Sequence, residues 1–273
     1  MRQTINRTKS IPWLCVVVGL FLLAPTLVFA QSDGYRAPRT ADGTPDLNGI
    51  WQAINTAHWD IEPHGASQGT ARELGALNAT PGGLGVVEGD AIPYRQEALE
   101  QRKDNFANRV ARDPAIKCYL PGVPRATYMP YPFQIIQSND HIMILHEFAG
   151  AVRTVYMQDH VPAPAPSWMG WSNGRWDGET LVIETEGFNG MTWFDRSGNF
   201  HSDGLRVVER ISARSPETLN YEATIDDPEI FTRSWTMRMP LYRRVEATAE
   251  LMEFRCVEFV EDLIYGHLRK QPD

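Results

Sequence analysis

The stretch FQIIQSNDHIMILHEFAGAVRTVYM, residues 133–157, decides the fold. Apolar and polar side chains alternate along it with a period of two, the pattern of half-buried β-strands. Asn139-Asp140 and Ala149-Gly150 interrupt the alternation and favour tight turns. The stretch therefore predicts three consecutive antiparallel strands, at residues 133–138, 141–148 and 152–157.

Five more runs of the same kind follow, with turn pairs such as Asp177-Gly178 and Asp227-Pro228 between them. Evenly spaced short strands with tight turns are typical of antiparallel barrels and sandwiches. Eight strands close into a barrel that holds one small ligand. We therefore expect a mainly β fold, an antiparallel eight-stranded barrel, with a strongly curved sheet or a sandwich as alternatives. The five runs are residues 180–186, 205–214, 219–225, 232–239 and 245–254.

One long amphipathic helix is predicted before these strands. Pro93 opens it, and Leu99, Phe106 and Val110 recur at helical spacing up to residue 111. The remaining expectations are an extended arm at residues 31–46, a first strand at 47–54, a short helix at 257–268, and a single domain over 47–273 with a helical insertion at about 55–115.

Residues 1–30 have the organisation of a secretory signal peptide. A basic start precedes the apolar residues 13–24, and Val28 and Ala30 supply small side chains before the cleavage point. The alternative is an uncleaved anchor, because the apolar stretch is almost long enough to span a bilayer. We expect cleavage, and a periplasmic or secreted protein without stable membrane insertion.

Charge and cysteine content support this location. Removal of residues 1–30, which carry three positive and no negative side chains, changes the formal net charge from −8 to −11. An acidic chain lacks the basic face that nucleic-acid binding requires. Cys118 and Cys256 remain, and in an oxidising compartment they are expected to form a disulfide, with two buried thiols as the alternative. No metal spacing is present, and no cofactor is expected.

Candidate catalytic residues gather in the segment 188–209. His201 is a candidate general acid or base, and Asp195 would fix its tautomer. Arg206 would hold a substrate carbonyl or carboxylate. The alternative is that Asp195 and His201 only tie the loop together through backbone hydrogen bonds.

Glu209 shares one face of its predicted strand with Val207 and Ile211. A carboxylate on an apolar face needs a partner or a raised pKa. It is therefore either a second acid/base group inside the barrel or half of a salt bridge. The candidate partners are Arg206, Arg233 and Arg238.

Aromatic residues in loops rich in proline and glycine suggest a pocket for a small apolar or aromatic molecule. We assign Trp168, Trp171 and Trp193 to it, with ordinary packing as the alternative. Further candidate ligand-binding residues are Tyr128, Tyr131 and His146.

Residues 170–174 match the G-x-S-x-G nucleophile motif around Ser172. That motif requires a strand before the serine and a helix after it. A proline-rich segment precedes it here and a turn follows, so we expect a loop and no nucleophile.

Four strings together resemble a broad family of exported bacterial proteins. The resemblance covers most of residues 40–266 and implies a secreted, β-rich, calycin-like or lipocalin-like domain. It assigns no catalytic residues. The strings are TPDLNGIW (44–51), CYLPGVPR (118–125), WMGWSNGRWDGETLV (168–182) and IDDPEIFT (225–232).

Three functions remain open from the sequence. The first is a cofactor-free lyase, isomerase or hydrolase that acts on a partly apolar substrate. The second is a lipocalin-type binding protein without turnover, and the third is an envelope protein that docks through the helix at 93–111. An imidazole–carboxylate contact in a wet pocket would favour the first, and an exposed apolar stripe on the helix the third. A closed apolar cavity with His201 outside it would favour the second.

Overall fold

The structure is a computed structural model that describes residues 35–69 and 71–268. The predicted signal peptide and the first four residues of the predicted arm lie outside these ranges. Residues 35–46 run along the barrel edge in extended and turn conformations, with one bridge between Arg39 and Pro45.

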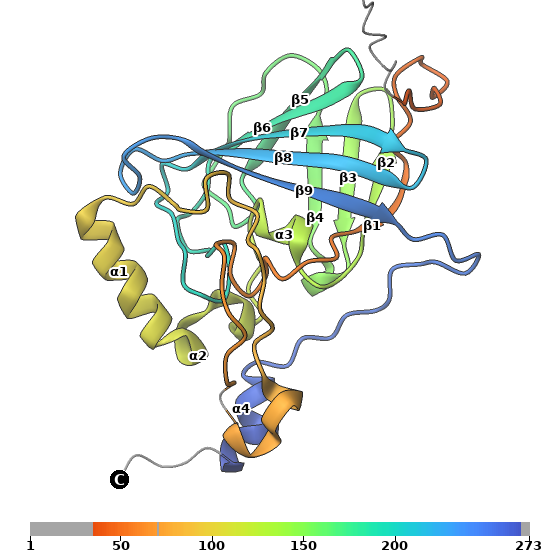
Figure 1. Ribbon diagram of the computed structural model, residues 1–273. Helices are drawn as coiled ribbons and strands as arrows, with labels where there is room; N and C mark the ends of the chain where they lie inside the picture. The colour runs from red at the N-terminus through yellow and green to blue at the C-terminus, as the bar shows by residue number, and fades with distance from the viewer. Residues whose placement is uncertain (1–34, 70, 269–273) are drawn as a thin grey trace, which may run out of the picture. The chain divides into compact units, whose positions relative to one another are not determined.

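Nine strands form one closed barrel (Figure 1). Each strand pairs with its neighbours in the sequence, and β9 pairs with β1 to close the ring. The prediction of a mainly β barrel is confirmed, with nine strands in place of eight. The strands are β1 (Gly49–Gln52), β2 (Phe133–Gln137), β3 (His141–His146), β4 (Val152–Tyr156), β5 (Trp171–Asp177), β6 (Thr180–Glu186), β7 (Arg206–Ser215), β8 (Thr218–Asp226) and β9 (Trp235–Arg243).

Two strand predictions were wrong. The predicted loop around Ser172 is β5, which forms a hairpin with β6 through Gly178, at φ 59°. Gly174 allows this strand to pack closely, because a Cβ there would lie 2.6 Å from the Val155 side chain. Residues 245–254, by contrast, form no strand, because β1 already occupies the edge of β9.

The barrel is also not wholly antiparallel. Strands β4 and β5 run parallel, with Val155 opposite Ser172 and Tyr156 opposite Asn173. Parallel neighbours require a long crossover connection, which residues 157–170 supply. The other strand pairs are antiparallel, as expected.

The interior of the barrel is filled by side chains that alternate along each strand. On β7, Val207, Glu209 and Ile211 are buried, whereas Arg206 faces the solvent. Apolar side chains from the other strands complete the core. They include Ile135, Ile144, Val155, Leu181, Ile183, Leu219, Ile225, Met237 and Leu241.

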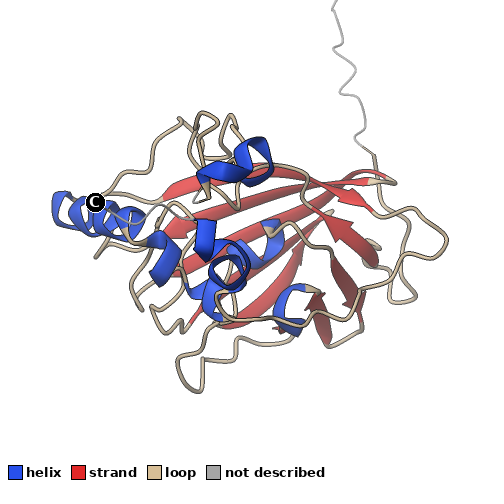
Figure 2. Ribbon diagram, turned by 90° about the horizontal axis from the view of Figure 1, so that it is seen from below, coloured by secondary structure: helices blue, strands red, loops and turns tan. Residues whose placement is uncertain are grey.

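Helices α1, α2 and α4, whose bounds are given below, lie on the lower side of the barrel in Figure 1, and α3 is seen at the level of the strands, next to β4 and β9. Seen from below, they lie with long loops in front of the strands (Figure 2). None of the helices in the described ranges combines the length and apolar character of a membrane span. The α-helices are α1 (Gln96–Ala107), α2 (Arg109–Arg112), α3 (Arg125–Tyr128) and α4 (Val260–Tyr265). The 3₁₀ turns are η1 (Arg72–Asn78), η2 (Pro114–Lys117), η3 (Phe148–Gly150) and η4 (Gly266–Leu268).

The predicted disulfide between Cys118 and Cys256 is confirmed, with Cα atoms 5.7 Å apart. It joins the end of η2 to the segment that leads into α4. The bond therefore anchors the C-terminal segment at the helical end of the barrel. A disulfide of this kind is typical of proteins in oxidising compartments.

Candidate functional site

His201 is buried, and both of its ring nitrogens are already engaged. Nδ1 lies 2.7 Å from the Ser202 carbonyl oxygen and Nε2 lies 2.6 Å from the Thr192 hydroxyl. Because a carbonyl oxygen only accepts, Nδ1–H donates to Ser202 and Nε2 accepts from Thr192. Burial lowers the pKa of His201, so the ring is neutral and carries no free lone pair for general base catalysis.

Asp195 does not orient His201, which corrects the predicted pairing. Its carboxylate accepts hydrogen bonds from the backbone N–H groups of Ile61 and Ser197, at 3.0 and 2.9 Å, and from the backbone and side chain of Asn199. Burial, with the charge of Asp60, raises the pKa of Asp195 to about 7, while the bonds from Asn199 and Ile61 oppose the rise. The residue ties its loop to residue 61, which was the structural alternative.

Arg206, the predicted group for holding a substrate carbonyl or carboxylate, lies outside the barrel. Its side chain is half exposed on the outer face of β7 and forms an ion pair with Glu184. The cause is strand alternation, because residues 207 and 209 point inward and residue 206 must therefore point outward. Arg206 holds nothing inside the barrel.

Glu209 lies inside the barrel, as expected, but its partner is Arg153, which is none of the three predicted arginines. The Tyr221 hydroxyl donates to the same carboxylate at 2.8 Å. Arg153 also donates to Ser172 Oγ at 2.8 Å and to Thr185 Oγ1 at 2.7 Å. The serine of the apparent nucleophile motif is thus part of a buried polar network, in which each charge is compensated.

His146 lies close to this network and packs against Phe133, with ring centroids 5.5 Å apart. Burial, followed by the charge of Arg153, lowers the pKa of His146 to about 3, and the Ala126 backbone opposes the shift. His146 is therefore a neutral core residue at physiological pH.

The predicted pocket aromatics do not gather in one place. Trp168 packs on Tyr119 and Trp171 stacks on Tyr156, with centroids 4.7 and 4.6 Å apart. Trp193 is buried, and its main chain forms an isolated antiparallel β-bridge with Phe200. The Tyr128 hydroxyl donates to the Phe194 carbonyl oxygen at 2.8 Å. Of the predicted ligand-binding residues, Tyr131 alone lines the cavity described next.

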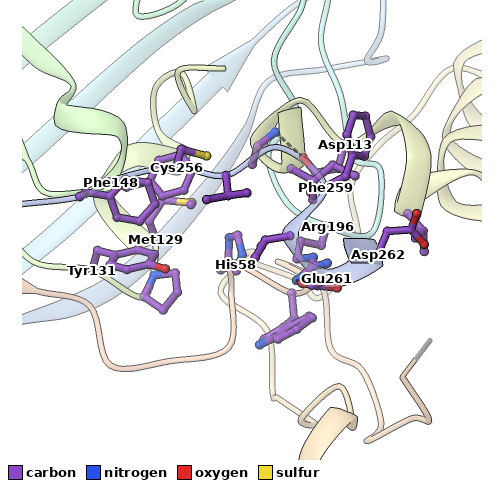
Figure 3. Close-up of a pocket in the computed structure, with 18 of the residues that line it drawn as sticks. His58, Asp113, Met129, Tyr131, Phe148, Arg196, Cys256, Phe259, Glu261 and Asp262 are labelled. Carbon is purple, nitrogen blue, oxygen red and sulfur yellow. Dashed lines mark hydrogen bonds and ion pairs between the residues drawn. The ribbon is translucent and has the colours of Figure 1, made fainter. Parts of the chain in front are cut away.

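A cavity of about 410 Å³ lies at the helical end of the barrel, outside its interior. We call it the terminal cleft, and Figure 3 shows its lining residues. Residues 254–262 line one side of it, and η2, the chain after α3 and Phe148 line the other. The apolar lining consists of Val110, Ala115, Ile116, Met129, Pro130, Tyr131, Phe148, Phe254, Val257, Phe259 and Val260.

Three aromatic rings form the apolar end of the terminal cleft. Tyr131, Phe148 and Phe254 contact one another, with centroid distances of 5.7, 5.1 and 4.9 Å. Met129 and Ala115 pack beside them in a small hydrophobic cluster separate from the barrel core. This end offers flat apolar surfaces with one hydroxyl group, on Tyr131.

The other end of the terminal cleft is polar (Figure 3). Arg196 forms an ion pair with Glu261 at 2.6 Å, and His58 lies between this pair and the aromatic rings. Burial and the charges of Arg125 and Arg196 lower the pKa of His58 well below its usual value. His58 is therefore neutral, and its buried Nδ1 has no hydrogen-bond partner among the described residues.

A buried ion pair fixes the wall between the terminal cleft and the barrel. Arg125 of α3 donates two hydrogen bonds to Asp113, at 2.8 and 2.9 Å, and both side chains are buried. Asp113 also accepts from the Ala115 N–H and so caps η2. The wall is therefore rigid on the side of η2 and α3, and the C-terminal segment closes the opposite side.

Sequence reasoning missed this site because its walls come from six separate parts of the chain. The predicted Cys118–Cys256 pairing was the one signal that placed residues 254–262 near η2. That signal was obscured because residues 245–254 were assigned to a strand.

In the described part of the chain, no group of three or more His, Cys, Asp or Glu side chains is arranged to hold a metal ion. No family model matches the sequence. No curated protein matches it either. The terminal cleft is therefore interpreted from its own residues.

Proposed function

We propose that this protein is an exported binding protein that holds a small, ring-containing apolar molecule in the terminal cleft without chemical turnover. The observation that carries the proposal is the cavity of about 410 Å³ with three aromatic rings at one end. Its volume falls within the range of small-molecule sites, which are lined mainly by apolar and aromatic side chains with a few polar groups.

The shape of the lining supports a flat ligand. Tyr131 and Phe254 meet edge to face, with an interplanar angle of 80°, which leaves ring faces and edges available to an aromatic guest. Met129 is unbranched and polarizable, and it adapts to rings of different outline. The Tyr131 hydroxyl adds one polar contact that orients the ligand.

The barrel interior is a poorer candidate for the binding site. Arg153 and Glu209 occupy its centre with their hydrogen-bond partners, and apolar side chains fill the remainder. A ligand there would have to displace a compensated ion pair, which costs several kcal/mol.

Catalysis by the predicted residues has no geometric support. His201 has both nitrogens engaged, Asp195 binds backbone groups, and Arg206 lies on the outer surface. Binding without turnover is therefore the function we propose.

A docking role for α1 also lacks support. The large apolar side chain that α1 exposes is Phe106, and Arg102 and Arg109 lie over its ring at 5.6 and 4.2 Å. These contacts leave no apolar stripe for a partner helix.

Export to the periplasm or the medium is part of the proposal. It rests on the predicted signal peptide, on the resemblance to exported bacterial proteins and on the disulfide, which is stable in an oxidising compartment.

Binding of 2-naphthamide, measured by isothermal titration calorimetry on the mature protein, tests the site. Val260→Trp fills the terminal cleft from α4, because Val260 belongs to its lining. Leu263→Trp adds the same ring on the same helix at a position that is 74% exposed and outside the lining.

We expect Val260→Trp to weaken 2-naphthamide binding at least tenfold, about 1.4 kcal/mol, and Leu263→Trp to leave it within twofold. Equal affinities for the wild type and Val260→Trp would refute the terminal cleft as the binding site. Circular dichroism of both variants checks that the barrel is intact.

A further inference from the structure

We propose that the ligand of the terminal cleft is an aromatic carboxylate, and that its carboxylate binds Arg196 in the place that Glu261 occupies in this structure. This inference rests on the proposed binding function and adds the chemical class of the ligand. Four observations support it: a second pocket, the position of Arg196, an arginine that has no acidic partner among the described residues, and the position of Glu261.

A second, polar pocket of about 220 Å³ adjoins the terminal cleft, and we call it the annex. Trp59, Val110, Arg196 and Glu261 line both cavities. The ion pair between Arg196 and Glu261 therefore stands at the boundary between an apolar cavity and a polar one. A ligand with an apolar ring in the cleft would place a polar substituent at this boundary.

Arg196 is held in position from two sides. Its backbone N–H donates to the His58 carbonyl oxygen at 3.0 Å, and its guanidinium lies 4.6 Å from the centroid of a Trp59 ring. The side chain is 18% exposed, so it remains within reach of a ligand. Arginine binds carboxylates in a planar, bidentate geometry, and a fixed guanidinium loses little entropy when it does so.

Arg109 also lines the annex, and among the described residues it has no carboxylate partner. It donates to the Phe106 carbonyl oxygen at 2.8 Å, and no described carboxylate forms an ion pair with it. Burial, with the nearby charge of Arg196, lowers the pKa of Arg109. Asp60 lines the same pocket but pairs with Arg102. The annex thus presents two guanidinium groups, of which Arg196 alone has an acidic partner among the described residues.

Glu261 is the more exposed half of the boundary pair. It lies on α4, a helix of six residues, and its side chain is 34% exposed. The carboxylate points to Arg196 at the polar end of the terminal cleft (Figure 3). An incoming carboxylate would replace Glu261 as the partner of Arg196 and release the Glu261 side chain to solvent. Arg196 would therefore keep one negatively charged partner.

The experiment compares two probes with the same ring system, 2-naphthoate and 2-naphthamide, on the mature protein by calorimetry. Glu261→Gln removes the competing charge, and Glu258→Gln is its matched control. Glu258 belongs to the same C-terminal segment, is exposed and lines neither cavity.

We expect Glu261→Gln to tighten 2-naphthoate binding about tenfold and to leave 2-naphthamide within twofold, because a charged hydrogen bond is freed for the ligand. Glu258→Gln should change neither affinity. Arg196→Gln should weaken 2-naphthoate binding about tenfold and leave 2-naphthamide within twofold; if that variant does not fold, the Glu261→Gln result decides.

The outcomes separate this inference from the proposed function. If both probes bind the cleft and Glu261→Gln changes neither affinity, the carboxylate assignment is wrong and the binding function stands. If neither probe binds the wild type, both proposals are wrong.

Discussion

Glu209 and Arg153 bring opposite charges together at the centre of the barrel. The pair is stabilised by hydrogen bonds from the Tyr221 hydroxyl and to Ser172 and Thr185. Burying two ions costs several kcal/mol, and their mutual attraction with these extra bonds offsets that cost. Loss of one partner therefore leaves the other as an uncompensated buried charge.

Glu209→Gln is expected to destabilise the protein by about 3–5 kcal/mol, because Arg153 would remain buried without a counter-charge. Urea unfolding followed by fluorescence measures the change. Arg206→Gln is the control, since it breaks a half-exposed ion pair on the same strand and should cost at most about 1 kcal/mol. Similar losses for both variants would contradict the role of the buried pair.

His146 makes stability depend on pH. Its pKa is about 3 in the folded protein, against about 6.5 in an unfolded chain. Between these values the unfolded state takes up the proton, so the contribution of His146 is fully present above pH 6.5 and is lost as the pH falls. Through His146, the free energy of unfolding is predicted to fall by about 2 kcal/mol between pH 7 and pH 5.

Asp195 has the opposite effect on the free energy of unfolding between pH 7 and pH 5. Its pKa is raised to about 7 in the folded state, so the folded protein takes up the proton and becomes more stable as the pH falls. The contribution of His146 is therefore measured as a difference between the wild type and His146→Gln in urea unfolding at pH 7 and pH 5. The variant should lose about 2 kcal/mol less than the wild type on acidification. Parallel losses in the two proteins would show that His146 is not buried as a neutral ring.

At the scale of elements, strands in which apolar and polar side chains alternate were predictable from the sequence. A strand that forms because its neighbours offer pairing edges was not. The runs from Phe133 to Met157 correspond to β2, β3 and β4, because one face of each is buried. Strand β5 follows a proline-rich crossover and contains Gly174, so its sequence resembles a loop. It becomes a strand because β4 and β6 offer edges on either side.

The candidate site was predictable only through its disulfide. Tyr131, Phe148 and Phe254 lie far apart in the sequence, and nothing in local periodicity indicates that their rings meet. The assignments at Asp195 and His201 failed for a different reason. Short polar residues in a loop satisfy backbone groups as readily as they form catalytic pairs, and the spacing does not separate the two.

The C-terminal segment forms no strand and is tied to the rest of the molecule by separate contacts. Besides the disulfide, the Phe259 N–H donates to the Ile116 carbonyl oxygen at 2.9 Å, and Glu261 pairs with Arg196. The Met252 N–H donates to Glu147 at 2.8 Å, and Phe254 packs on the aromatic rings of the cleft. Reduction of the Cys118–Cys256 bond should therefore loosen the wall of the terminal cleft before it affects the barrel.

We expect reduction by dithiothreitol to weaken 2-naphthamide binding at least fivefold, about 1 kcal/mol, while the far-UV circular dichroism of the strands stays unchanged. Cys118→Ser/Cys256→Ser should behave in the same way without reductant. Unchanged affinity in both cases would show that the disulfide does not support the cleft.

At the scale of the whole molecule, the barrel acts as a scaffold and the cleft is built on one of its ends. The interior of the barrel is occupied by its own polar network and apolar core. The terminal cleft is lined by residues of α2, η2 and α4 and of loops at the helical end. We therefore propose that the ligand lies outside the barrel, whereas the sequence suggested a barrel with a ligand in its interior.

A crystal structure of the mature protein with 2-naphthamide tests this arrangement most directly. The account predicts electron density for the naphthalene ring in the terminal cleft, against Phe148, Tyr131 and Phe254, with the Arg153–Glu209 pair intact. Density for the ring inside the barrel, with Arg153 and Glu209 separated, would contradict it.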